Sequence, residues 1–323
     1  MKHHFSLMAI AIALAAAGCG QQAQVEQIHN GARITSDGIS MKVQFYTPSA
    51  VRVVKWTPDG SESKQSLIII ADSAKDVNYT LTQNGRKVEL LSDALKVVIN
   101  TQKATIEYFN TSGKPILKES GQEFSPMIFH TDTAQTVKQI FSLSADEALY
   151  GLGQHQNGYM NLRGKHVMLA QANTEAVSPV YISTRNYGII WDNYSKVVFD
   201  DDGTSTQSIL ADVADNIDYY FVYGNNMDSA IAQYRYLTGT APMYGKWAYG
   251  YWQSKEHYDT QDELLTVARK YRKLRIPIDN IVQDWDYWYG NQNWGSMQWH
   301  PAIFPKPIEM INELHDMHYH LMV

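Results

Sequence analysis

The last 75 residues, from Tyr249 to Val323, follow a pattern of strand, helix, strand, long loop, helix and strand. Strands that alternate with amphipathic helices form a parallel sheet with the helices packed outside it. The pattern therefore predicts the opening of a (β/α)8 barrel, also called a TIM barrel. A closed barrel needs about 250 residues, so we expect an incomplete barrel in this stretch.

Start and stop signals define the elements of this segment. Residues 260–263 (TQDE) have the form of a capping box, in which the Thr260 hydroxyl accepts from the N–H three residues on and Glu263 reaches back. Pro277 ends this helix, and Pro307 begins the next one. The predicted strands are 248–252, 278–283 and 320–323.

Asp284 directly follows the second predicted strand, and Trp285 follows Asp284. The active site of a barrel lies at the carboxyl ends of its strands, so this position favours a ligand contact for Asp284. The alternative is that Asp284 caps a turn or lies in water. Its tryptophan neighbours favour the ligand contact, because aromatic walls are typical of small-molecule sites.

Six of the eight tryptophans fall between Trp247 and Trp299. Core packing accounts best for Trp247 and Trp252. The other four lie in or beside a predicted loop: Trp285, Trp288, Trp294 and Trp299. The same loop carries hydrogen-bonding side chains: Asp284, Asp286, Asn291, Gln292 and Asn293. Aromatic faces match the C–H faces of a pyranose ring, and carboxylates and amides bind its hydroxyls, so the loop indicates a sugar ligand.

Four motifs in the barrel segment can be compared with a known family. They are 250–256 (GYWQSKE), 279–285 (DNIVQDW), 294–296 (WGS) and 304–307 (FPKP). These motifs resemble glycoside hydrolase family 31, most of all its α-xylosidase branch. The upstream motifs 150–154 (YGLGQ) and 187–193 (YGIIWDN) are similar to the galactose-mutarotase-like β-sandwich domain of that family. The resemblance covers most of the chain after its first residues.

The resemblance implies an exo-acting, retaining α-glycosidase with two catalytic aspartates, whose carboxyl groups lie about 5–5.5 Å apart in such enzymes. In the family both aspartates come from later barrel strands, so we expect neither in these 323 residues and no activity from this stretch alone. Asp284 matches the family's aspartate at the end of the second strand. The resemblance implies that Asp284 binds hydroxyls of the terminal sugar and that Trp285 walls its subsite. An amide is expected where this sequence has Asp286.

A second group of substrate-binding candidates lies far upstream, at Asn173 and Glu175. The resemblance implies that residues 173–175 belong to a loop of the sandwich domain that reaches the active site in relatives. We expect no cofactor and no metal ion, and the resemblance implies an oligosaccharide as the substrate.

The chain begins with a basic segment and a 13-residue stretch, 5–17, that is apolar apart from Ser6. This stretch is too short to span a bilayer and suits a signal peptide. Residues 16–19 (AAGC) resemble a bacterial lipobox, which implies lipidation of Cys19. The alternative, an ordinary cleavage site, is less favoured because Cys19 is the only cysteine. We expect a signal peptide at 1–18, a tether at 19–33, and an exported protein that is lipid-anchored to a bacterial membrane.

The middle of the chain alternates apolar and polar residues in short runs between turn signals such as Asn84-Gly85. This pattern predicts an antiparallel β-sandwich at 34–240. A helix is expected at 228–237, with Gly239 as its stop. The predicted fold is thus a β-sandwich followed at 241–323 by the first part of the barrel.

Charge and motif spacing exclude several function classes. The net charge of −6 gives no basic field for nucleic acid. Residues 151–153 (GLG) lack the third glycine of a dinucleotide site, and 200–203 (DDDG) lack the spacing of a calcium loop and predict a solvated turn. The cluster of His315, His318 and His320 has no further ligand that would complete a metal site. The oligomeric state stays open.

The leading hypothesis is part of an α-xylosidase acting on xyloglucan-type oligosaccharides. Its rival, from a different class, is a lipid-anchored glycan-binding protein without catalysis. An α-glucosidase of the same family is a further alternative.

Overall fold

The computed structural model describes residues 23–36, 38–62, 65–129 and 132–323. The chain divides into two compact units, of which one ends at Thr240 and the other runs from Ala241 to Val323. The predicted signal peptide and Cys19 lie outside the described residues. Each unit is described by itself.

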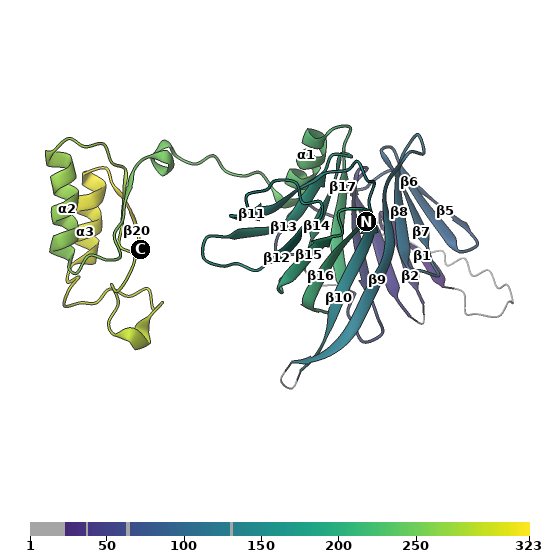
Figure 1. Ribbon diagram of the computed structural model, residues 1–323, viewed down its shortest axis with the longest axis horizontal. Coiled ribbons are helices and arrows are strands. Elements are labelled where there is room, and N and C mark those ends of the chain that lie inside the picture. Colours follow the sequence, from purple (N-terminus) through teal and green to yellow (C-terminus); the bar gives the residue numbers. More distant parts are fainter. Residues whose placement is uncertain (1–22, 37, 63–64, 130–131) are drawn as a thin grey trace, which may run out of the picture. The chain divides into compact units, whose positions relative to one another are not determined.

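The first unit is a β-sandwich of two antiparallel sheets, as predicted (Figure 1). One sheet has the spatial order β1 (Gln24–Ile28), β2 (Gly31–Thr35), β3 (Ser40–Thr47), β4 (Ala50–Trp56), β17 (Ile217–Tyr223), β14 (Tyr187–Trp191), β13 (Ala176–Ser183) and β11 (Leu149–Gln154). The other has the order β12 (His166–Leu169), β15 (Val197–Asp201), β16 (Thr206–Ala214), β10 (Asp132–Ser142), β9 (Pro115–Phe129), β8 (Thr105–Asn110), β7 (Leu95–Asn100), β6 (Lys87–Ser92) and β5 (Tyr79–Asn84).

Alternation of apolar and polar residues explains how these strands form a core. Along β7, Leu95, Val97 and Ile99 are buried, and the residues between them are partly exposed. Successive side chains of a strand point to opposite faces, so one face of β7 joins the core. Tyr108 stacks on Phe221 of the opposite sheet with ring centroids 3.9 Å apart. Such contacts across the two sheets hold the sandwich together.

The sandwich core also contains a satisfied ion pair. Lys55 Nζ lies 2.7 Å from Glu119 Oε2, and both side chains are fully buried. The other Glu119 oxygen accepts a hydrogen bond of 2.6 Å from the Tyr219 hydroxyl. Burial lowers the pKa of Lys55 and raises the pKa of Tyr219 well above its usual value. Because each charge has a bonded partner, this pair is a structural element of the core.

The last element of the sandwich unit is a helix. Helix α1 (Met227–Thr238) begins at the cap Asn226, whose side chain accepts from the Ser229 N–H, and it ends at Gly239. The predicted helix and its stop are confirmed. The helix packs against β13, β14 and β17. No helix among the described residues is long and apolar enough to cross a membrane.

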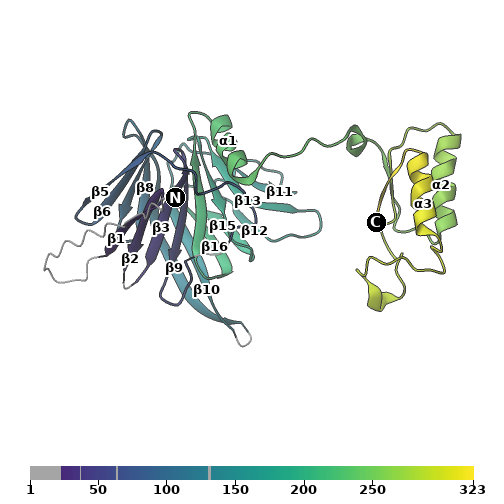
Figure 2. The same ribbon diagram turned by 180° about the vertical axis from the view of Figure 1, so that it is seen from behind.

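The second unit contains the predicted parallel sheet and its two helices (Figure 2). Its strands are β18 (Trp252–Gln253), β19 (Asn280–Val282) and β20 (His320–Met322), which pair in that order. Helices α2 (Gln261–Lys273) and α3 (Pro307–Asp316) lie side by side. Leu264 and Ala268 of α2 and Met310 and Leu314 of α3 are buried. This arrangement is the start of a (β/α)8 barrel.

Two local predictions in this unit are wrong in detail. The aromatic run at 248–252 forms only the short strand β18, because the chain before it turns through a 3₁₀ helix, η1 (Lys246–Tyr249). The Asn280 side chain binds the Trp247 carbonyl in this turn at 2.9 Å. The capping box is also incomplete: Thr260 accepts from the Glu263 N–H, but Glu263 accepts from Asp259 N–H instead of that of Thr260.

Candidate functional site

The carboxyl ends of β18, β19 and β20 meet at one edge of the parallel sheet. Asp284 follows β19 after one residue, Gln283, and therefore lies at this edge. Its carboxylate is exposed and makes no hydrogen bond or ion pair within residues 241–323. An exposed, unengaged carboxylate at a strand end is free to accept hydrogen bonds from a ligand.

A cluster of tryptophans flanks Asp284. The Trp285 ring is half-buried, and it contacts Trp288 edge-on at 5.1 Å and Trp294 edge-on at 4.5 Å between ring centroids. Trp288 is buried and stacks parallel to Trp294 at 6.0 Å. Trp294 itself keeps 68% of its surface exposed. The loop thus presents an aromatic surface that is supported from behind by buried rings.

The polar residues of this loop serve different purposes. Asp286 adopts a positive φ of 54° and is exposed. Asn293 closes the short helix η2 (Asn291–Asn293) by donating from its side chain to the Tyr289 carbonyl. Asn291 and Gln292 are exposed and remain available to a ligand. The predicted sugar-like character of the loop therefore rests on Asp284, the indole rings and these two amides.

Hydrogen bonds hold the loop after β19 against the loop after β18. The Trp285 N–H donates to the Glu256 carbonyl at 3.0 Å. The Gln283 side chain accepts from the Tyr258 N–H and donates to the Trp285 carbonyl. Sequence reasoning treated Gln283 as a strand residue and missed this role. Its only signal in the sequence is a polar residue at the end of an apolar strand.

Asn173 and Glu175 lie in the sandwich unit, in the turn between β12 and β13. Thr174 between them has a positive φ of 73°, and Ala172 and Glu175 pair across the turn. Glu175 Oε2 lies 3.6 Å from Nδ1 of His155, whose Nε2 lies 2.9 Å from the Leu152 carbonyl. Asn173 is exposed. Their predicted contact with a sugar stays a prediction, and His155 is a neighbour that sequence reasoning missed.

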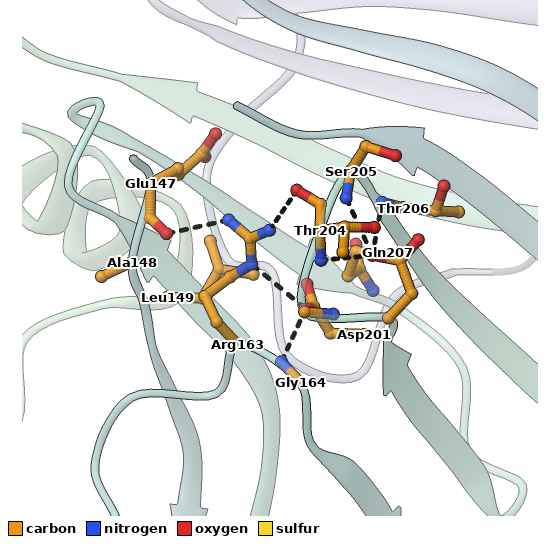
Figure 3. A network of polar contacts seen from close by, with 12 residues as sticks. Glu147, Ala148, Leu149, Arg163, Gly164, Asp201, Thr204, Ser205, Thr206 and Gln207 are labelled. Atoms are coloured by element: carbon orange, nitrogen blue, oxygen red, sulfur yellow. Dashed lines mark hydrogen bonds and ion pairs between the residues drawn. The ribbon is translucent and has the colours of Figure 1, made fainter. Parts of the chain in front are cut away.

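The expectation of a solvated turn at 200–203 is wrong for Asp201. Its side chain is fully buried and lies 3.1 Å from Arg163 Nε. Figure 3 shows the Arg163 guanidinium between two turns, where it also donates to the carbonyls of Glu147 and Thr204 at 2.8 Å each. Asp201 further accepts from the Gly164 and Gly203 N–H groups. The other three residues of the turn, Asp200, Asp202 and Gly203, are exposed, so Asp201 alone departs from the expected solvated turn.

A hollow of about 440 Å³ on the outer face of β6 to β9 is an alternative site. It is lined by lysines and glutamates that pair between neighbouring strands, with Lys118 of β9 3.2 Å from Glu107 of β8. Its one aromatic ring, Phe109, lies under the Lys96 ammonium at 5.0 Å. These contacts are typical of a solvated charged sheet face, so Asp284 is the better candidate.

Among the described residues, no group of three or more His, Cys, Asp or Glu side chains is placed to hold a metal ion. The ring of His320, one of the three clustered histidines, stacks on Trp247 at 3.9 Å.

Comparisons with known proteins match both units. Residues 241–323 match the model of the glycosyl hydrolases family 31 TIM-barrel domain. Residues 40–200 match the glycosyl hydrolase 31 N-terminal galactose mutarotase-like domain. The two models agree on one family.

Individual relatives point the same way. An α-xylosidase of Saccharolobus solfataricus is 32% identical over 289 residues, which cover 86% of this chain and 39% of that protein. An uncharacterized family 31 glucosidase of Pseudescherichia vulneris is 28% identical, over 80% of this chain and 55% of the relative. The solved structure of a family 31 α-xylosidase from a soil metagenome, complexed with xylose, has a TM-score of 0.79 at 25% identity and covers 93% of this chain and 46% of that one. The chain therefore spans about half or less of the length of these relatives.

Proposed function

Because the chain belongs to glycoside hydrolase family 31, we propose that it is part of a retaining, exo-acting α-glycosidase whose preferred substrate is an α-xyloside of the xyloglucan type. The observation that carries the proposal is Asp284, an exposed carboxylate at the end of β19 beside a wall of indole rings. A terminal sugar needs both features, since its hydroxyls require acceptors and its ring requires a flat apolar partner.

Asp284 has a binding role in this proposal. Its two oxygens accept hydrogen bonds from hydroxyls of the terminal sugar, and Trp285 limits the space beside that sugar. A xylosyl ring lacks the hydroxymethyl group of a glucosyl ring, so a subsite walled by a bulky indole favours the smaller sugar. The 32% identity to an α-xylosidase supports this preference.

The two catalytic carboxylates are proposed to lie on later barrel strands, as the family resemblance implies. One attacks the anomeric carbon to form a glycosyl-enzyme, while the other protonates the leaving oxygen and then activates water. Residues 1–323 on their own are accordingly proposed to be inactive, because removing both carboxylates abolishes the covalent pathway.

The similarity to a family 31 glucosidase favours an α-glucosidase as the second candidate. The two are separated by assaying the full-length protein on 4-nitrophenyl α-xyloside and α-glucoside and following the first-formed anomer by NMR. We expect the xyloside to be cleaved with at least about tenfold higher kcat/KM, a transition-state difference of about 1.4 kcal/mol, and the α-anomer to be released first. Cleavage of the glucoside alone would establish the second candidate. Binding of both sugars without turnover would establish a glycan-binding protein.

We further propose that the protein is exported and held at a bacterial membrane through lipid on Cys19. The support is the AAGC sequence at 16–19 behind an apolar stretch. Such an anchor would keep the enzyme beside the cell surface, where oligosaccharides arrive.

A further inference from the structure

We propose that Gln283 is a positioning residue that sets the geometry of the sugar subsite by clamping together the loops that follow the first two barrel strands. This inference rests on the proposed glycosidase function and deepens it. Gln283 does not contact the sugar in this account. It acts through Trp285 and through its neighbour in the chain, Asp284.

The side-chain amide of Gln283 uses both of its ends. Its Oε1 accepts from the Tyr258 N–H at 3.3 Å, and its Nε2 donates to the Trp285 carbonyl at 3.0 Å and to the Tyr258 carbonyl at 3.3 Å. Tyr258 belongs to the loop after β18, and Trp285 belongs to the loop after β19. One buried side chain therefore joins the two loops.

The backbone of the same residue reaches the third strand. The Gln283 N–H donates to the Met322 carbonyl at 2.9 Å, and the Trp285 N–H donates to the Glu256 carbonyl at 3.0 Å. The ends of β18, β19 and β20 thus meet at Gln283, which is fully buried. Asp284, the next residue, is exposed.

Burying an amide side chain has an unfavourable desolvation free energy, because its polar atoms lose their hydrogen bonds to water. An apolar side chain would pack at this position without that cost. A fully bonded amide instead restricts the loops to one relative placement, since any shift breaks at least one of its bonds. Precise placement matters at such a site, because a displacement of about 1 Å costs about a hundredfold in rate.

The same strand supplies a matched control. Asn280 is also a fully buried amide, and its Nδ2 donates to the Trp247 carbonyl at 2.9 Å. It stands at the start of β19 instead of its end. Replacing Asn280 therefore disturbs the packing of the strand without touching the loops at its carboxyl end.

The experiment compares Gln283→Met and Asn280→Leu in the full-length protein by kinetics, thermal melting and hydrogen–deuterium exchange. We expect Gln283→Met to lower kcat/KM at least about tenfold more than Asn280→Leu, mainly through kcat, at a similar loss of Tm. We also expect faster amide exchange at 255–259 and 284–288 in the Gln283 variant alone. A Gln283→Leu variant removes both the acceptor and the donors, so it should show the same defect.

Equal loss of kcat/KM in the two variants, or unchanged exchange in both loops, would overturn the inference and leave Gln283 as an ordinary core residue. Failure of the proposed function would give a different result from failure of this inference. In that case neither glycoside is cleaved by the wild-type protein, while the exchange comparison still decides whether Gln283 clamps the loops.

Discussion

The Arg163 guanidinium lies 3.1 Å from the Asp201 carboxylate and joins two turns that are 38 residues apart in the chain. The Arg163 side chain is 8% exposed and that of Asp201 is fully buried. The Arg163 guanidinium also donates to the Thr204 carbonyl, and Asp201 Oδ1 also accepts from the Gly164 N–H (Figure 3). This contact therefore joins the turn at Arg163 to the turn at Asp201.

Replacing Arg163 by Met should therefore lower the free energy of unfolding by about 3–5 kcal/mol, because Asp201 would be left charged and buried. Lys196→Met is the control, since Lys196 pairs with Asp212 at 2.8 Å but the two side chains are 45% and 38% exposed. That pair should contribute less than about 1 kcal/mol. Chemical denaturation of both variants measures the difference. Equal effects would mean that the buried pair is no stronger than a surface pair.

Asp202 should make the stability of the sandwich depend on pH. Backbone N–H groups of Thr206 and Thr204 lower the pKa of its carboxyl far below the usual value. A carboxyl whose pKa is lower in the folded state stabilises the fold above its ordinary pKa of about 3.9, and it loses that contribution as the pH falls toward the lowered value. We expect Asp202→Ala to reduce Tm at pH 7 and the difference from wild type to shrink below about pH 4. A difference that stays constant from pH 7 to pH 2 would contradict the role of the charge.

Sequence reasoning succeeded where short-range chemistry decides the structure. Alternation predicted strands such as Leu95–Asn100, and the residues Thr260 and Gly239 predicted helix ends that the structure contains. Strand order in a barrel placed Asp284 at a carboxyl end. These features depend on neighbours in the chain, so the chain itself reveals them.

Contacts between residues far apart in the chain could not be predicted in this way. The buried position of Asp201 depends on its contact with Arg163, and the role of Gln283 depends on its hydrogen bond to the Tyr258 backbone 25 residues away. The aromatic run at 248–252 looked like a strand, but a 3₁₀ turn held by Asn280 shortens it. No local sequence pattern identifies such partners, because these residues come into contact only in the folded protein.

Cys19 tests the proposed location. Mass spectrometry of the mature protein expressed with its leader in a bacterium should find a lipid-modified N-terminal cysteine, and the protein should fractionate with membranes. Cys19→Ser should remain in the membrane only through an uncleaved leader. An unmodified soluble product that starts at another residue would refute the anchor.

The isolated segment 249–323 should fail to fold stably. In residues 241–323, β20 pairs only with β19, and Met322 and Val323 are about half exposed at that edge. A parallel sheet normally has both faces covered, and an open apolar strand edge promotes aggregation. Size-exclusion chromatography and thermal melting of the segment should show aggregates and no cooperative transition. A monomer with a sharp melt would contradict this expectation.

The proposed function depends most on Asp284, which is proposed to bind hydroxyls of the terminal sugar. Hydrogen bonds to a charged acceptor contribute about 1.5–3 kcal/mol each, and those that strengthen as the sugar flattens toward the transition state act on kcat as well as KM. The carboxylate is exposed and makes no contact that stabilises residues 241–323, so its removal should spare the fold. Asp286→Asn is the control, because Asp286 is an exposed carboxylate two residues away and asparagine tolerates its positive φ.

The most direct measurement is steady-state kinetics of Asp284→Ala in the full-length protein on an aryl α-xyloside, with a thermal melt beside it. We expect kcat/KM to fall by about two orders of magnitude or more at an unchanged Tm. Near-normal kcat/KM would show that Asp284 is a turn residue without a ligand. Lost activity together with a collapsed melt would show that its role is structural.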